Sequence, residues 1–245
     1  MGFEDDWRVW HAARESYAGA EYGPSALEST NWLITMPAAV DGLPGLWALT
    51  GDGGIHGTEL GVAGSQVTLR GSETLRLGRR ELRVFDRRGT VGLRVFNPQR
   101  PQRVGFTAID AYPPREGWRV PAVFEPAQGE SLTVTSVDGS THESAIAGRL
   151  RFTLDGVPLA LTVTRGSNGG LGAVFGDSTN GIETYRFRFL PIDEPEADGS
   201  AWIDFNRAYL PPCAFSDQFV CPLPPLENRF TASIRAGERA VILGR

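Results

Sequence analysis

Side chains that could carry chemistry gather in two segments of the last third of the chain. The first is FGDSTNGIETYRFRF (175–189), and the second is DFNRAYLPPCAF (204–215), followed by CPLPPLENRF (221–230). Carboxylates can act as general acids or bases and a thiol as a nucleophile, but a corner of the fold can also require such residues. The candidate ligand-binding residues are Asp177, Asn180, Glu183, Tyr185, Arg207, Tyr209, Cys213, Glu227, Asn228 and Arg229.

The two cysteines, Cys213 and Cys221, have the spacing C-x₇-C. Two reduced, buried thiols are favoured for a protein of the cytoplasm. A disulfide across this short loop, a metal site and a nucleophilic thiol stay open as alternatives. Zinc would need two further ligands, which the segment does not offer. A nucleophile would need a pKa lowered by a nearby cation such as Arg207 or Arg229.

Standard catalytic and cofactor motifs are absent from the sequence. It contains no phosphate-binding Walker loop, no HExxH helix and no GxSxG nucleophile turn. The glycine-rich stretch 169–176 leads into a strand and not a helix, which argues against dinucleotide binding. The three histidines, His11, His56 and His142, are far apart in the sequence. We therefore predict neither a metal site nor a cofactor.

The candidate residues must be positioned by β-strands, because short β-type runs separated by Gly, Pro, Asn and Asp dominate the chain. Residues 82–96 form a predicted hairpin with Gly89 in its turn. Residues 149–163 form a second predicted hairpin, closed by Asp155-Gly156. Pro121 places the strand of WRVPAVFEP at a sheet edge or at a bend.

A third predicted hairpin joins residues 183–192 to residues 200–209 through the acidic loop between them. In a symmetric register, Arg188 faces Asp204 and Arg186 faces Asn206, which gives a structural charge ladder. The other face is aromatic and becomes polar at its end. There the side chains either pair with one another or line the mouth of a barrel. These side chains belong to Glu183, Tyr185, Arg207 and Tyr209.

Many strands without interleaved helices predict an all-β fold, a single antiparallel β-barrel or sandwich-like domain with one N-terminal helix. The domain is expected to span residues 1–245, with a weak sub-boundary near residues 112–117. Asp5 or Asp6 can cap the helix, which is expected at about residues 5–18. The helix face that packs on the domain is expected to hold Trp7, Trp10, Ala13 and Tyr17, with His11 on the solvent side.

Charge and hydropathy exclude several classes of partner. The net charge of −5 argues against a nucleic-acid binder. Residues 70–103 carry ten arginines against three acidic residues, most simply as a solvated sheet face, although a docking role stays open. No apolar run could span a membrane and no signal peptide is evident, so we expect no membrane partner and a cytoplasmic location. A homodimer stays open, since exposed sheet edges often pair.

The two C-terminal segments closely resemble DUF1684, an uncharacterised, mainly prokaryotic family of unknown function. WRVWHAARE, LRLGRRELRVFDRRGTVGLRVFNP and YPPREGWRVPAVFEP are similar to the same family in the same order. The resemblance implies a bacterial protein with a single β-rich domain, and it brings no established activity, substrate or catalytic residue. The chain departs from the family pattern over residues 33–64 and at Leu210, where the family tends to have Asn.

Three functions are compatible with these residues. The favoured one is binding of a small molecule in a barrel mouth lined by Tyr185, Arg207 and Tyr209. The second is an enzyme of hydrolase, isomerase or cyclase type that uses a carboxylate or Cys213 in the same pocket. The third is a structural or interaction module in which the motif stabilises the fold and residues 70–103 form a basic face for a partner.

Overall fold

The computed structural model describes residues 2–166 and 169–244. The chain forms two compact units, a larger one of residues 1–16 and 107–245 and a smaller one of residues 17–106. Each unit has a hydrophobic core. The weak boundary expected near residues 112–117 lies inside the larger unit, and the single domain stays a prediction. The predicted class is confirmed, since the fold is mostly β with antiparallel sheets and one long N-terminal helix.

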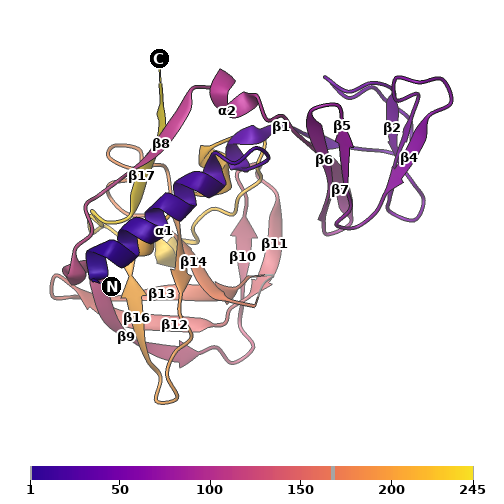
Figure 1. Cartoon of the computed structure of the whole chain (residues 1–245). Coiled ribbons are helices and arrows are strands. Elements are labelled where there is room, and N and C mark those ends of the chain that lie inside the picture. The colour runs from indigo at the N-terminus through magenta and orange to yellow at the C-terminus, as the bar shows by residue number, and fades with distance from the viewer. Residues whose placement is uncertain (1, 167–168, 245) are drawn as a thin grey trace. The chain divides into compact units, whose positions relative to one another are not determined.

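The smaller unit contains two sheets, with the orders β1-β7-β6-β5 and β2-β3-β4 (Figure 1). The predicted hairpin over residues 82–96 is confirmed as β6 and β7. Arg88 and Gly89 have φ angles of 52° and 84°, as a two-residue turn of type I′ requires. The elements are η1 (Pro24–Ala26), β1 (Leu27–Trp32), β2 (Leu46–Leu49), β3 (Ile55–Thr58), β4 (Gln66–Leu69), β5 (Thr74–Leu77), β6 (Arg80–Arg87), β7 (Thr90–Phe96) and α2 (Arg100–Arg103).

Ion pairs within the smaller unit engage at least five arginines of the basic segment 70–103. Glu28 pairs with two of its arginines, Glu81 with two more and Asp52 with one. The arginines in these pairs are Arg70, Arg76, Arg80, Arg83 and Arg103. The segment is therefore less basic in its surroundings than its sequence alone indicates.

The larger unit is built on one six-stranded sheet of the order β15-β14-β13-β12-β9-β16, which curves into a half-barrel (Figure 1). The predicted hairpin over residues 149–163 is confirmed as β12 and β13, with Asp155 and Gly156 at φ angles of 50° and 78°. The strands are β8 (Phe106–Ala111), β9 (Arg119–Pro126), β10 (Ser131–Thr135), β11 (Thr141–Ala145), β12 (Gly148–Leu154), β13 (Val157–Arg165), β14 (Leu171–Phe175), β15 (Arg188–Ile192), β16 (Ser200–Asp204) and β17 (Glu238–Leu243).

The third predicted hairpin is wrong, because β15 and β16 lie at opposite edges of the six-stranded sheet. In the register of the sheet, Arg188 faces Phe175 on β14, and Asp204 faces Arg119 on β9. The charge ladder predicted between β15 and β16 therefore does not form. In a curved sheet the first and last strands approach each other, so a short loop can join strands that are not hydrogen-bonded neighbours.

Strand β9 is an interior strand, so of the two predicted alternatives, an edge or a bend, the edge does not hold. It lies between β12 and β16, yet its ladder with β12 ends at Ala122. Pro121 faces only Trp202 on β16, so its missing amide hydrogen is not required on the β12 side. Proline, which cannot donate a backbone hydrogen bond, is thus accommodated because the ladder between β9 and β12 ends at the adjacent residue, Ala122.

Helix α1 (Phe3–Ala18) packs on the larger unit along a different line from the one predicted. Trp7 and Ala18 are buried, whereas Ala13 and Tyr17 are exposed. His11, expected on the solvent side, stacks on the ring of Trp7 at a centroid distance of 4.8 Å. Within the larger unit the packed line thus runs through Trp7 and His11, at the spacing i, i+4, and not through Ala13.

The core of the larger unit is centred on Phe205, directly after β16. Its ring contacts the rings of Trp118, Phe152 and Phe175 at centroid distances between 5.7 and 6.4 Å. Such tilted and edge-on contacts stabilise an aromatic core beyond the burial of area alone. The segment DFNR therefore begins inside the core.

Substituting Gly237 by alanine tests the close packing of the C-terminal segment against this core. Gly237 has a φ angle of 75°, and an added Cβ would lie 2.4 Å from the carbonyl oxygen of Ala208. We expect Gly237→Ala to lower the free energy of unfolding by about 2–5 kcal/mol, from overpacking and the left-handed conformation together. Urea denaturation measures the change. Gly117→Ala, where no atom lies within 4 Å, is the matched control, and equal midpoints for the two variants would contradict the prediction.

Candidate functional site

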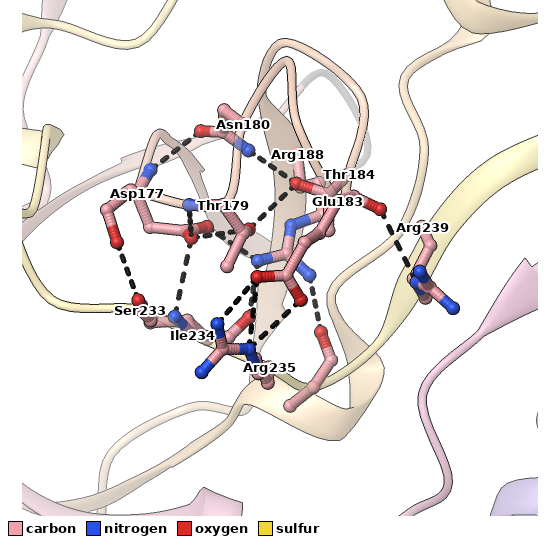
Figure 2. A network of polar contacts seen from close by, with 12 residues as sticks. Asp177, Thr179, Asn180, Glu183, Thr184, Arg188, Ser233, Ile234, Arg235 and Arg239 are labelled. Atoms are coloured by element: carbon pink, nitrogen blue, oxygen red, sulfur yellow. Dashed lines mark hydrogen bonds and ion pairs between the residues drawn. The ribbon is translucent and has the colours of Figure 1, made fainter.

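A buried ion pair joins the loop of residues 176–181 to the start of β15 (Figure 2). Arg188 Nη2 lies 2.6 Å from Asp177 Oδ2, and both side chains are fully buried. Arg188 also donates to the carbonyl oxygens of Ile234, at 2.9 Å, and of Ala236. Burial lowers the pKa of Arg188, and the charge of Asp177 opposes that shift. Because neither side chain is exposed, the pair stabilises the fold and is not available to a ligand.

The loop that carries Asp177 is closed by its own side chains. Asp177 Oδ1 accepts hydrogen bonds from the amide and the hydroxyl of Thr179, at 2.8 and 2.6 Å. Asn180 Oδ1 accepts from the amide of Asp177 at 2.6 Å, and its Nδ2 donates to Thr184 Oγ1 and to the carbonyl oxygen of Tyr185 at 2.9 Å each. Such side-chain-to-backbone bonds are typical of Asp and Asn in turns. The polar atoms of Asn180 are therefore used inside the loop.

The DFN segment forms a corner of the fold. Residues Phe205–Arg207 form the 3₁₀ helix η3, and its cap, Asp204, accepts from the amide and from Nδ2 of Asn206 at 3.0 and 2.8 Å. Asn206 is fully buried and exchanges two hydrogen bonds of 3.0 Å with the main chain of Arg115. Its carbonyl oxygen accepts from Trp7 Nε1 at 2.9 Å. This corner connects α1, η3 and the segment before β9.

Two further polar side chains of the C-terminal motif are buried in structural roles. Asn228 exchanges two hydrogen bonds of 2.8 Å with the main chain of Thr162 on β13. Glu238 is fully buried, and it accepts from Arg14 Nε at 2.8 Å and from the amide of Leu210 at 2.7 Å. Buried polar groups paired in this way hold neighbouring segments together. The side chain of Asn228, a predicted ligand-binding residue, is therefore used in hydrogen bonds to strand β13.

Glu183 lies at the surface in an ion pair with Arg235. Arg235 Nη2 donates to Glu183 Oε1 at 2.6 Å, and the hydroxyl of Tyr112 donates to Oε2 at 2.8 Å. The hydrogen bonds from Arg235 and then from Tyr112 lower the pKa of Glu183 to about 2. A carboxylate with so low a pKa is a weak general base at neutral pH, which argues against the predicted acid–base role for this residue.

The three residues predicted to line one barrel mouth lie in three places. Arg207 packs over the ring of Trp10, at 5.4 Å from its centroid, and lines a cavity of about 540 Å³ beside α1. Tyr209 packs edge-on against Phe189, and Tyr185 lies among the thiols. The 3₁₀ helix η3 interrupts the strand alternation that would have placed Arg207 and Tyr209 on one face, so the structure does not bring the three residues to one pocket, and ligand binding by them stays a prediction.

The two cysteines lie together in a small apolar cluster. Both are free and buried, as the favoured alternative predicts, and the amide of Cys213 donates to Cys221 Sγ at 3.3 Å. The hydroxyl of Tyr185 donates to the carbonyl oxygen of Cys213 at 3.0 Å and lies 3.6 Å from its Sγ. Arg186 Nη2 donates to the same hydroxyl at 3.2 Å. The cation nearest this cluster is thus Arg186, and not Arg207 or Arg229 as the sequence suggested.

A pocket of about 250 Å³ brings several predicted residues together, and we call it the Arg186–Arg229 pocket. Arg229 Nε donates to the carbonyl oxygen of Pro224 at 3.1 Å, which fixes the guanidinium. The side chain of Asp177 is fully buried, so its main chain faces the pocket. The lining residues are Gly176, Asp177, Asn180, Arg186, Phe187, Leu223, Pro224, Arg229 and Phe230.

The candidate residues are thus only partly brought together. Asp177, Asn180 and Arg229 line the pocket, and Tyr185 contacts Arg186 at its edge and Cys213 beyond it. Glu227 is exposed, and Glu183, Arg207, Tyr209 and Asn228 lie elsewhere. Arg186 was assigned to a charge ladder and missed as a site residue. No local signal separates Arg186 from Arg188, because residues i and i+2 of a strand point to the same face.

The family model described as a protein of unknown function, DUF1684, matches residues 104–239. The chain belongs to the DUF1684 family. This chain is also similar to an uncharacterised protein from Haloarcula marismortui whose solution structure is known, with 31% sequence identity and a TM-score of 0.47. The match covers 58% of this chain and 80% of that protein. None of the curated proteins compared with the chain matches it. Every candidate site residue lies within the matched DUF1684 residues, whereas α1 lies outside them.

The described residues form neither a metal cluster nor a membrane-spanning helix. Within residues 2–166 and 169–244, no three His, Cys, Asp or Glu side chains come together as a metal site would require. In that same part of the chain, no helix has both the length and the apolar character needed to cross a bilayer.

Removing Arg188 tests the buried ion pair of the DUF1684 domain. Arg188→Met leaves Asp177 buried without its counter-ion, so we expect the free energy of unfolding to fall by about 3–5 kcal/mol in urea denaturation. The double variant Asp177→Asn/Arg188→Met removes both charges and keeps an acceptor for Thr179, so it is expected to recover part of the loss. Arg151→Met removes an exposed ion pair with Glu125 and is the control. A loss no larger than that of the control would contradict a stabilising role.

Glu183 gives a prediction for acid pH. Its folded-state pKa of about 2 lies below the ordinary value of 4.5, so the folded chain binds fewer protons than the unfolded one. The contribution of Glu183 to stability is therefore complete above about pH 4.5 and is lost as the pH falls towards 2. Glu183→Gln lacks this contribution, so its melting temperature should fall less steeply with acid over that range. Exposed Glu227→Gln is the control, and parallel curves for wild type and Glu183→Gln would refute the prediction.

Proposed function

We propose that this DUF1684 domain binds a small molecule that carries a carboxylate or phosphate group in the Arg186–Arg229 pocket. The observation that supports it is the uneven pairing of charges around the pocket. The one acidic residue that lines the pocket, Asp177, forms an ion pair with Arg188. Arg186 and Arg229 form no ion pair with any residue that the structure describes. Two guanidinium groups on one pocket are thus left for an anion from outside the chain.

Hydrogen bonds hold each guanidinium in place, and that of Arg186 also interacts with Cys213. Arg229 uses Nε for the carbonyl oxygen of Pro224, and Arg186 uses one Nη2 hydrogen for the hydroxyl of Tyr185. The hydrogen bond with Tyr185 raises the pKa of Arg186, which keeps the cation charged. A guanidinium binds carboxylate or phosphate oxygens through such N–H groups.

The rest of the pocket limits the size and character of the ligand. Phe187, Leu223, Pro224 and Phe230 supply an apolar wall opposite the polar groups. A volume of about 250 Å³ is below the usual range for drug-sized ligands, about 300–1,000 Å³, and suits a small metabolite. A short organic acid or phosphate ester, with a few carbon atoms for the apolar wall, fits these features.

Anion binding by Arg229→Gln tests this function. We expect inorganic phosphate and succinate to shift amide signals of residues 176–186 and 223–230 in two-dimensional NMR titrations. Arg229→Gln loses one charge-assisted hydrogen bond, which contributes about 1.5–3 kcal/mol. We therefore expect its dissociation constant to rise about tenfold to a hundredfold. Binding should also weaken as ionic strength rises.

The control is Arg151→Gln, an exposed arginine on β12 outside the pocket. It should bind both anions like wild type at equal ionic strength. Equal affinity of the wild type and Arg229→Gln, or signal shifts spread over all surface arginines, would overturn the proposed site.

A further inference from the structure

We propose that Cys213 and Cys221 form a reversible dithiol–disulfide pair that reduces small hydroperoxides, with Cys213 as the attacking thiol and Cys221 as the resolving thiol. This activity does not depend on ligand binding in the Arg186–Arg229 pocket. It rests on the contact between the amide of Cys213 and the sulfur of Cys221, and on the polar groups beside the thiol of Cys213.

The two cysteines are placed for a disulfide. The amide of Cys213 lies 3.3 Å from Cys221 Sγ, so the backbone of one cysteine touches the sulfur of the other. Their cluster also contains Phe187, Phe219 and Leu223, apolar side chains that keep competing nucleophiles away. The intervening residues 214–220 close a short loop, which makes the approach of the two sulfurs a local event.

Cys213 is the thiol that meets the polar groups. The hydroxyl of Tyr185 lies 3.6 Å from its Sγ, and Arg186 in turn donates to that hydroxyl. Cys213 keeps 8% of its surface exposed and Cys221 only 3%, so a small oxidant reaches Cys213 more easily. Burial raises the pKa of Tyr185 to about 12, which keeps its hydroxyl protonated and able to donate at neutral pH.

The surroundings favour the thiolate of Cys213. The hydrogen bond from the thiol of Cys221, then that of Tyr185 and the charge of Arg186, lower the pKa of Cys213 to about 7, against the opposing effect of burial. At pH 7 the thiolate fraction is then about fifteenfold that of a cysteine with a pKa of about 8.5. Nucleophilicity falls with pKa, so the net gain in rate from ionisation alone is about threefold.

The reaction balances in two steps. The thiolate of Cys213 attacks the O–O bond of the hydroperoxide, an S–O bond forms, and the alkoxide leaves and takes up a proton to become the alcohol. Cys221 then attacks the sulfur of the sulfenic acid, an S–S bond forms, and water leaves. The hydroperoxide is reduced and the two thiols are oxidised. A small thiol or dithiol restores the pair by disulfide exchange.

The experiment uses the reduced full-length chain and one equivalent of hydrogen peroxide at pH 7. We expect one equivalent of peroxide to be consumed per chain, with the loss of two hydrogen atoms in the intact mass and recovery with dithiothreitol. Cys221→Ser should stop at a sulfenic acid that dimedone traps on Cys213. Cys213→Ser should consume peroxide no faster than a free cysteine.

Positioning by Tyr185 and Arg186 has a separate readout. The pH profile of iodoacetamide alkylation of Cys213 should have its midpoint near pH 7 in the wild type, and at pH 7 alkylation should be about threefold faster than in the urea-unfolded chain. Tyr185→Phe and Arg186→Gln should move that midpoint upwards, whereas the remote Arg151→Gln should not. This profile needs no cysteine variant, so it holds if Cys213→Ser fails to fold.

Three results would overturn the proposal. Peroxide consumption by folded Cys213→Ser at the wild-type rate would remove Cys213 from the reaction. Oxidised wild type without a Cys213–Cys221 disulfide would remove the pair. If the alkylation midpoint is unchanged in both Tyr185→Phe and Arg186→Gln, these two side chains do not influence the ionisation of Cys213.

Discussion

The ion pair between Asp177 and Arg188 is the constraint on which the C-terminal half of the larger unit depends. A buried guanidinium without a counter-ion is strongly unfavourable, so β15 can keep Arg188 inside only if the loop 176–181 supplies Asp177. The same guanidinium requires the carbonyl oxygens of Ile234 and Ala236. One charge therefore connects the loop 176–181 and β15 to residues 234–236, which lie more than forty positions later in the sequence.

The corner at Asp204 and Asn206 completes this arrangement from the other edge of the sheet. Asp204 caps the 3₁₀ helix η3 directly after β16. Asn206, inside η3, is hydrogen-bonded to the main chain of Arg115 and to the indole of Trp7. The polar residues of DFNR are thus mostly used by the fold itself. Asp204 and Arg207 of this segment line the cavity beside Trp10.

The internal use of carboxylates also decides where chemistry remains available. Asp177, Glu183 and Glu238 each have an arginine partner within the larger unit. Arg186 and Arg229 have none among the residues described, and they lie on the same pocket. Because Arg186 also reaches Tyr185, which contacts Cys213, one side chain belongs both to the anion site and to the surroundings of the thiol. Anion binding and thiol chemistry are separate proposals that share this residue.

The sequence by itself determined the β-rich class, the helix and the hairpins over residues 82–96 and 149–163, because their turns are specified by residues such as Arg88-Gly89 and Asp155-Gly156 with positive φ. It also located the region of the pocket, since Asp177, Asn180 and Arg229 are of residue types and in turns that sequence patterns reveal. Only the tertiary structure decided the partners. The order of strands places β15 and β16 at opposite edges, and η3 ends the alternation assumed for Arg207 and Tyr209. Which arginine is buried and which is left for a ligand depends on contacts between distant segments, and Arg186 and Arg188 look alike in a local pattern.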